Sequence, residues 1–342
     1  MSALTSESFW GWVVVPLAVL GATVWLSAFT RDWLRRRAIL DQPVERSSHA
    51  TPTPRGGGIA LLPVVLFAWI MLALAGLAPS GTLAIVALAA ALALISWYDD
   101  LGEIAIGWRL TAHLVAATVG VTFLLGPLPV FQGLLPPLLD RIAAILLWAW
   151  FINLYNFMDG IDGITCVETV AIGGGIVLVA RLAGDDADAA LPALALAAGA
   201  LGFLRWNWPR ASIFLGDVGS VPLGFITGWL LLLLASRGAW APALILPLYY
   251  LADATLTLLR RIARGERFWQ AHRSHFYQRA LAPDNDHGAV LTLVIGGNAA
   301  LLLLALAAVS WPWPALVIAL LAVASLLAQL ARRSRRLATP PL

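Results

Sequence analysis

The chain has 342 residues, of which 60% are hydrophobic and only 12% are charged, and its mean hydropathy is +0.83. These values exclude an ordinary soluble domain, in which about 25% of the residues are charged. The net charge of +3 would suggest a nucleic-acid partner in a soluble chain, but arginines at membrane edges account for it here, so we expect no nucleic acid. The single cysteine, Cys166, excludes an internal disulfide and argues against a thiolate metal site.

Apolar runs long enough to cross a bilayer, which takes about 20 residues, recur along the whole chain. The runs are continuous, whereas the strands of a membrane barrel alternate polar and apolar residues, so we expect helices. The sequence predicts an all-α polytopic membrane protein with about eleven transmembrane helices. It forms a single integral-membrane domain, residues 1–342, that ends in a basic tail at 332–342. The runs are 9–29, 58–77, 81–98, 110–131, 142–158, 163–180, 189–204, 218–236, 239–259, 288–310 and 313–331.

The distribution of arginine predicts the orientation, because short cytoplasmic loops collect basic residues. With eleven alternating spans, 19 of the 22 basic residues lie on one side and three, Arg141, Arg181 and Arg237, on the other. The N-terminus is therefore expected in the periplasm and the C-terminus in the cytoplasm. All the polar motifs described next then fall on the cytoplasmic face.

The first two polar motifs combine glycine, arginine and acid residues. Arg46-Ser-Ser-His49 and Arg55-Gly-Gly-Gly58 form a glycine-rich basic entry to a helix, which suits either a bound phosphate or close packing. Asp99 and Asp100 end the third run and, on a helix, would diverge by about 100°. One of them could act as a general base or metal partner, and the alternative is a solvated helix end.

The next two motifs are rich in oxygen ligands. Asn153, Asn156, Asp159 and Asp162 have helix-like spacing, and amide and carboxylate oxygens suit Mg²⁺ or Mn²⁺. Asp217 lies between glycines at the start of the eighth run, where a helix dipole favours an anion. A structural cap is the alternative for both motifs.

The last motif, His272-Arg273-Ser-His275, lies in the largest cytoplasmic loop. No nearby cysteine or third histidine completes a zinc site, so contact with a phosphate or nucleotide is favoured over zinc, and a solvated basic loop is the alternative. His113 and Glu168 lie within predicted spans and should face the bundle interior. We assign them no role.

Taken together and in this order, the motifs over residues 41–277 resemble the polyprenyl-phosphate N-acetylhexosamine-1-phosphate transferases, glycosyltransferase family 4. The segments around Arg55 and His272 look like the bacterial branch that initiates O-antigen or related surface-glycan synthesis. The peptidoglycan branch, which transfers phospho-muramoyl-pentapeptide, carries lysines in its early loops and a run of histidines in its last loop. This chain has no lysine. The peptidoglycan reaction is kept as the alternative.

The resemblance implies transfer of a sugar 1-phosphate from a UDP-N-acetylhexosamine to undecaprenyl phosphate, which yields UMP, at the cytoplasmic face of the bacterial inner membrane. It implies Mg²⁺, with Mn²⁺ as a substitute, held by Asp217 and Asn156. Asp99 or Asp100 would deprotonate or orient the lipid phosphate. The implied substrate-binding residues are Asn153, Asp159, Asp162, His272, Arg273, His275, Arg109 and Arg55.

Two other classes compete with an enzyme, a polytopic transporter and a structural scaffold. Transporter sites usually lie near the bilayer midplane, whereas the acids of this chain gather at one face. A scaffold would require no metal ion. A homodimer through lipid-facing helices is also expected.

Overall fold

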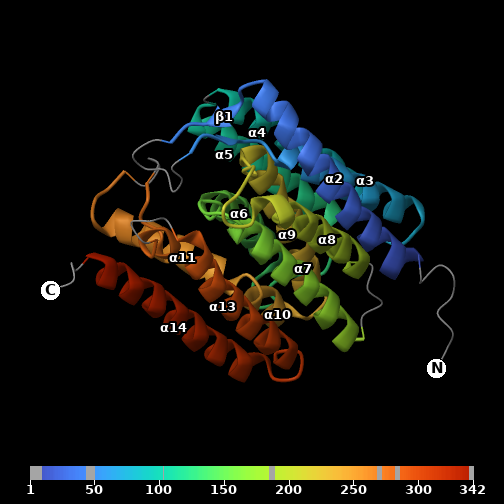
Figure 1. Ribbon diagram of the computed structural model, residues 1–342. Helices are drawn as coiled ribbons and strands as arrows, with labels where there is room; N and C mark the ends of the chain where they lie inside the picture. Colours follow the sequence, from blue (N-terminus) through green and yellow to red (C-terminus); the bar gives the residue numbers. More distant parts are fainter. Residues whose placement is uncertain are drawn as a thin grey trace.

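The computed structural model describes residues 10–43, 51–102, 104–184, 189–267, 272–281 and 286–338, and these form a bundle of helices (Figure 1). One small antiparallel sheet pairs β1 (Leu40–Asp41) with β2 (Thr53–Pro54). The helices are the π-helical turn η1 (Trp10–Val14), α2 (Val15–Arg36), α3 (Gly58–Leu74), α4 (Thr82–Leu101), α5 (Ile106–Val119), the π-helical turn η2 (Gly120–Leu124), α6 (Pro137–Phe157), α7 (Ile164–Leu182), α8 (Ala190–Asn207), α9 (Asp217–Ser236), α10 (Trp240–Ile245), α11 (Leu248–Ala263), α12 (Phe276–Arg279), α13 (His287–Ala307) and α14 (Pro312–Ala338).

Seven helices in the described part of the chain are long and apolar enough to cross a membrane. They are η1 with α2, α4, α6, α7, α9, α13 and α14. A multi-pass helical membrane protein is therefore confirmed. The count of eleven spans stays a prediction, since some of the predicted spans, such as α3 with 17 residues, are shorter than these seven helices. The orientation of the termini also stays a prediction.

The predicted span 239–259 is not one helix. It is divided into α10 and α11 on either side of Leu246 and Pro247. Pro247 has no amide hydrogen to donate to the preceding turn, and α11 begins directly after it. The prediction of one continuous helix here is therefore wrong.

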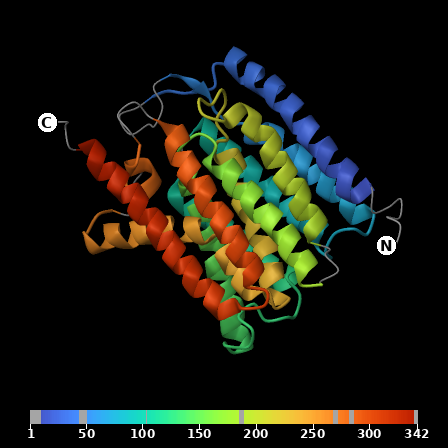
Figure 2. The same cartoon turned by 60° about the horizontal axis from the view of Figure 1, so that its bottom comes forward.

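Helix α9 forms the centre of the bundle. All its residues from Val218 to Ser236 are buried, as expected for a helix that is apolar on every side. It packs against α3, α4, α6 and α7, whereas α2 and α14 lie on opposite edges of the bundle (Figures 1 and 2). The first residue of α9, Asp217, is thus held among the ends of its neighbours.

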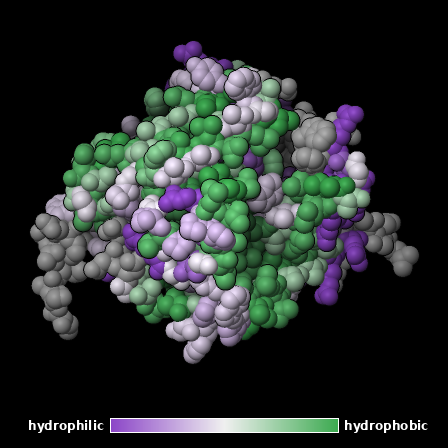
Figure 3. All heavy atoms as spheres, turned by 180° about the vertical axis from the view of Figure 1, so that it is seen from behind, coloured by the Kyte–Doolittle hydropathy of each residue, from purple (hydrophilic) through white to green (hydrophobic). Residues whose placement is uncertain are grey.

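The outer surface of the bundle is strongly apolar. Large side chains such as Phe67, Phe123 and Leu303 are exposed, and hydrophobic residues cover broad areas of the face in Figure 3. In water such areas would drive association, but lipid tails cover them at no hydrophobic cost. The surface agrees with a membrane setting.

The glycine-rich segment before α3 runs beside the start of α9. The amides of Gly56 and Gly57 donate to the Phe214 carbonyl at 3.2 and 2.8 Å, and the Gly58 amide donates to the Leu215 carbonyl at 2.9 Å. A Cβ on Gly58 would lie 2.4 Å from the backbone of Gly219. Of the two alternatives for this motif, the structure therefore shows close packing, since all three amides are already bonded. Residues 46–49 lie outside the described residues.

Gly58→Ala should destabilise the protein by about 1 to 3 kcal/mol, because backbone atoms on the opposite side cannot move away from the added methyl group. The measurement is the apparent Tm in detergent. Gly174→Ala is the matched control, since Gly174 is also helical but has open space around its Cβ position. Equal Tm values for the two variants would contradict the close approach of α3 and α9.

Candidate active site

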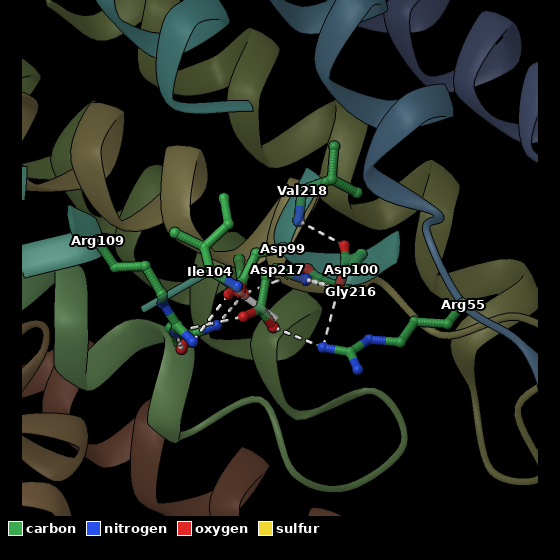
Figure 4. Close-up of polar contacts among 10 residues, drawn as sticks. Arg55, Asp99, Asp100, Ile104, Arg109, Gly216, Asp217 and Val218 are labelled. Carbon is green, nitrogen blue, oxygen red and sulfur yellow. Dashed lines mark hydrogen bonds and ion pairs between the residues drawn. The ribbon is translucent and has the colours of Figure 1, made fainter. Parts of the chain in front are cut away.

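Five charged side chains meet where α4 ends and α9 begins, and Asp217 lies at their centre (Figure 4). One oxygen of Asp217, Oδ1, lies 2.8 Å from Nη2 of Arg55. The other, Oδ2, lies 3.3 Å from Nη2 of Arg109. The two arginines approach from opposite sides, so a single carboxylate links the segment before α3 to α5.

Asp99 and Asp100 diverge, as expected for adjacent residues on a helix. Asp100 accepts hydrogen bonds from the amides of Asp217 and Val218 at 3.1 and 2.9 Å and pairs with Arg55 at 2.8 Å. Asp99 accepts a hydrogen bond from the Ile104 amide at 2.9 Å and pairs with Arg109 at 2.8 Å. Asp100 therefore caps α9 from another helix, a role that the alternative reading of the motif had given to Asp217.

The three carboxylates differ in how far they are open to a ligand. The exposed fraction of the side chain is 1% for Asp100, 9% for Asp99 and 17% for Asp217. Their partner Arg55 is strongly held in its charged form: burial alone would lower its pKa, but Asp217 and Asp100 together raise it. Asp217 is thus the carboxylate in this cluster most accessible to a substrate or cation.

The end of α6 adds oxygen ligands to the cluster. Oδ1 of Asn156 accepts a hydrogen bond from Arg109 at 3.2 Å, and its amide nitrogen donates to Ser220 Oγ at 2.9 Å. Asp159, just beyond α6, accepts a hydrogen bond from Thr165 at 2.6 Å. Burial raises the pKa of Asp159 to about 7, and the charge of Asp217 adds to this effect despite the opposing Thr165 bond. Asn156 and Asp217 are therefore brought together at Arg109, and Asp159 follows Asn156, with its amide donating to the Asn156 carbonyl at 3.2 Å.

The other two residues of this motif make contacts within the fold. Asn153 donates to the Ala149 carbonyl of its own helix at 2.7 Å. Asp162 is buried, accepts a hydrogen bond from the Ala211 amide at 3.0 Å and lies 3.1 Å from Nδ1 of His287. Their predicted contacts with substrate stay predictions.

The segment that contains His272 to His275, called the histidine loop below, is attached to the end of α6 through the helix that follows it. The hydroxyl of Tyr277, in α12, donates to the Phe157 carbonyl at 3.1 Å, so the loop lies beside Asn156 and Asp159. His272 and Arg273 are partly exposed, whereas His275 is buried. Burial, followed by the charges of His275 and Arg261, lowers the pKa of His272 to about 4. His272 is therefore neutral at pH 7.

Nδ1 of His272 lies 3.3 Å from the Ser274 amide, which donates to it, and 2.8 Å from Ser274 Oγ. Because Nδ1 accepts the amide hydrogen, the neutral ring carries its own hydrogen on Nε2. His272 can thus act as a neutral donor, the property that the predicted phosphate or nucleotide contact requires.

The sequence patterns missed Asp253 and Tyr277. Asp253 lies in α11 and holds the backbone of α12, with the Phe276 and Tyr277 amides at 3.0 and 3.2 Å. An ionisable residue inside an apolar run was the available signal, since the same observation singled out His113 and Glu168.

Comparison with known proteins gives one consistent result. The family model described as glycosyl transferase family 4 matches residues 82–235. The chain is 29% identical over 326 residues to decaprenyl-phosphate N-acetylglucosaminephosphotransferase of Mycobacterium leprae (strain TN), and this match covers 81% of the chain and 80% of the relative.

A second relative is phospho-N-acetylmuramoyl-pentapeptide-transferase of Mycobacterium bovis (strain BCG / Pasteur 1173P2). It is 30% identical over 260 residues, which cover 62% of this chain and 72% of the relative. The residues matched by the family model, 82–235, include Asp99, Asp100 and Asp217 and all of α9 except its last residue. The chain therefore belongs to glycosyl transferase family 4, the polyprenyl-phosphate hexosamine-1-phosphate transferases, and is a membrane phosphosugar transferase.

Proposed function

We propose that the protein transfers an N-acetylated hexosamine 1-phosphate from a UDP-sugar to undecaprenyl phosphate, which yields undecaprenyl-diphosphate-sugar and UMP and initiates O-antigen or a related surface glycan. The observation that carries the proposal is Asp217, shared by Arg55 and Arg109 beside Asn156. Oxygen ligands for a cation and guanidinium groups for phosphates lie side by side, as a phosphoryl transfer between two phosphorylated substrates requires.

Two observations favour a simple hexosamine over phospho-muramoyl-pentapeptide. The match to the N-acetylglucosaminephosphotransferase of M. leprae covers 81% of the chain, whereas the match to the pentapeptide transferase of M. bovis covers 62%. The chain also lacks lysine, which the resemblance associates with the peptidoglycan branch. A panel of UDP-sugars, with UMP release as the readout, tests this choice, and use of UDP-muramoyl-pentapeptide alone would reverse it.

Mg²⁺ is the proposed cofactor, with Mn²⁺ as a substitute. No group of three or more His, Cys, Asp or Glu side chains among the described residues is placed to hold a metal ion. The proposed metal ligands are oxygen atoms of Asp217 and Asn156, with Asp99 beside them. In the structure all three residues contact the Arg109 guanidinium. Oxygen atoms that stabilise one cation fit Mg²⁺, which binds few protein groups and completes its shell with water and phosphate. A bound Mg²⁺ would neutralise charge on the transferred phosphate.

The site divides between the two substrates. Asp99 lies near the end of α4 and Arg109 lies near the start of α5, and they are proposed to orient the polyprenyl phosphate. Asp100 has both carboxylate oxygens engaged in the α9 cap, so Asp99 is the preferred candidate for this role. His272, Arg273 and Asp159 are proposed to bind the sugar nucleotide.

The active site is proposed to face the cytoplasm, because 19 of the 22 basic residues fall on that side in the predicted topology. Leu134→Cys, at a position 80% exposed before α6, should react with a membrane-impermeant thiol reagent in intact cells. Arg264→Cys, after α11, where the side chain is 67% exposed, should react only after permeabilisation. The native Cys166 is buried and supplies the background. The reverse labelling pattern would overturn the orientation.

Asp217→Ala should lower transfer by about a hundredfold or more, because it removes both a proposed metal ligand and the partner of two arginines. The measurement is UMP release from UDP-N-acetylglucosamine in detergent with undecaprenyl phosphate and Mg²⁺. Chelation with EDTA should stop the wild-type reaction and added Mg²⁺ should restore it. Asp32→Ala is the matched control, since Asp32 is an exposed acid in α2. Near-normal turnover of Asp217→Ala would sink the assignment.

Arg109→Ala and His272→Ala should fail on different substrates. The first should raise the apparent KM for undecaprenyl phosphate and the second that for the UDP-sugar. Each loses a charge-assisted or polar phosphate contact of roughly 1.5 to 3 kcal/mol, which is about ten- to a hundredfold. Kinetics with each substrate varied in turn decide the matter. Equal effects on both substrates in both variants would show that the division of the site is wrong.

A further inference from the structure

Asp253 is a fully buried carboxylate in α11, with an exposed fraction of 0%. Five donors surround it. Oδ1 accepts from the Phe276 amide at 3.0 Å and lies 3.3 Å from both His275 Nδ1 and Thr257 Oγ1. Oδ2 accepts from the Tyr277 amide at 3.2 Å and the Tyr249 hydroxyl at 3.4 Å. A buried carboxylate is tolerated only with such partners, and three of the five belong to residues 275–277.

The contact with Asp253 determines which nitrogen of His275 carries the hydrogen. A carboxylate can only accept, so Nδ1 of His275 carries the hydrogen. The His275 side chain is only 4% exposed, and its ring stacks on that of Tyr277 with centroids 5.6 Å apart. His275 is thus engaged with the protein through Nδ1 and through its ring face, while the partly exposed His272 and Arg273 precede it in the same loop.

The other end of the loop is attached to the opposite half of the site. The Tyr277 hydroxyl donates to the Phe157 carbonyl at 3.1 Å, and a Cβ on Gly160 would lie 2.2 Å from that hydroxyl oxygen. Between Asp253 on one side and Phe157 and Gly160 on the other, α12 has little freedom to shift. His275 directly precedes α12, and its ring lies 5.0 Å from that of His272, so α12 is connected to the exposed part of the loop through His275.

We propose that Asp253 and His275 form a buried pair that positions the histidine loop for the sugar nucleotide, with His275 acting through Asp253 rather than by contact with substrate. This inference rests on the proposed function, since it assigns the loop to the nucleotide. Asp253 and His275 are positioning residues, and His272 and Arg273 are the groups that meet the ligand.

Substitution of His275 by its two amide analogues separates positioning from contact. Asparagine places its amide nitrogen near the position of Nδ1 and can still donate to Asp253, whereas glutamine reaches the position of Nε2 and loses that bond. His275→Asn should keep the apparent KM for the UDP-sugar within about threefold of wild type. His275→Gln and His275→Ala should raise it about tenfold, as expected for a lost polar contact. If glutamine rescues better than asparagine, His275 contacts the substrate through Nε2 and the proposal is wrong.

Asp253→Asn should likewise raise the KM for the UDP-sugar about tenfold, with the KM for undecaprenyl phosphate within about twofold of wild type. Thr257→Val is the matched control, because it removes one donor to Asp253 without touching residues 275–277. Gly160→Ala, which pushes on Tyr277 from the other side, should reproduce the effect of Asp253→Asn. An unchanged KM in Asp253→Asn would overturn the proposal.

Amide hydrogen exchange over residues 272–281 gives a readout that does not depend on activity. Exchange should accelerate in Asp253→Asn, His275→Ala and His275→Gln and stay near wild type in His275→Asn and Thr257→Val. If the wild-type protein transfers no sugar phosphate, the proposed function fails, and these exchange rates still decide whether Asp253 and His275 hold the loop. Unchanged exchange in Asp253→Asn would contradict the pair.

Discussion

The sharing of Asp217 between two arginines is the interaction on which the site depends. Three carboxylates and two guanidinium groups meet there, and they leave one negative charge uncompensated at the end of an apolar bundle. Coulomb interactions are strong where water is largely excluded, so each of these groups needs its partners. The remaining negative charge makes the cluster receptive to a cation, and this is the physical basis for the proposal of Mg²⁺.

The cluster also explains why several helices must end at the same level. Asp100 caps α9 from α4, Arg55 reaches Asp217 only because the segment before α3 packs against the segment before α9, and Asn156 bridges α6 to Arg109 and to Ser220. Each contact joins residues that are far apart in the chain. The result is a cluster of side chains from four segments around Asp217, beside the histidine loop that Asp253 of α11 holds.

Much of the architecture was predictable from the sequence because hydropathy and charge act locally. Runs of apolar residues became helices, and members of several polar motifs, Arg55, Asp99, Asp100, Arg109 and Asn156, meet around Asp217, whereas Asn153 and Asp162 make other contacts within the fold. The sequence could not decide whether Gly56 to Gly58 bind a phosphate or pack closely. The same glycines could leave their amides free for a ligand or bond them to the Phe214 carbonyl, and only the fold shows which occurs. The role of Asp100 as a cap depends on an approach of α4 to α9 across 117 positions, which no local pattern encodes.

Two features of the segment 239–259 were not predicted, the break at Pro247 and the role of Asp253, and both have physical causes. Pro247 breaks the predicted span, but the hydropathy of a 20-residue run averages over a single proline, and the neighbouring apolar residues concealed it. Asp253 was hidden in the same run, although a carboxylate at that depth needs a partner and therefore indicates one. Both residues lie in or next to α11, the helix that holds residues 275–277 through Asp253.

The break at Pro247 has a mechanical consequence. A continuous rod across the bilayer would carry any tilt of its outer end to its inner end, but α10 and α11 are not joined by an unbroken ladder of hydrogen bonds. The second of the two helices, α11, is tied to α6 through Trp150, whose indole donates to Thr255 at 3.1 Å, and it also packs against α14. Changes in membrane thickness that tilt α10 can thus be absorbed at the break. The segment that α11 holds through Asp253, residues 275–277, then keeps its position relative to α6 when α10 tilts.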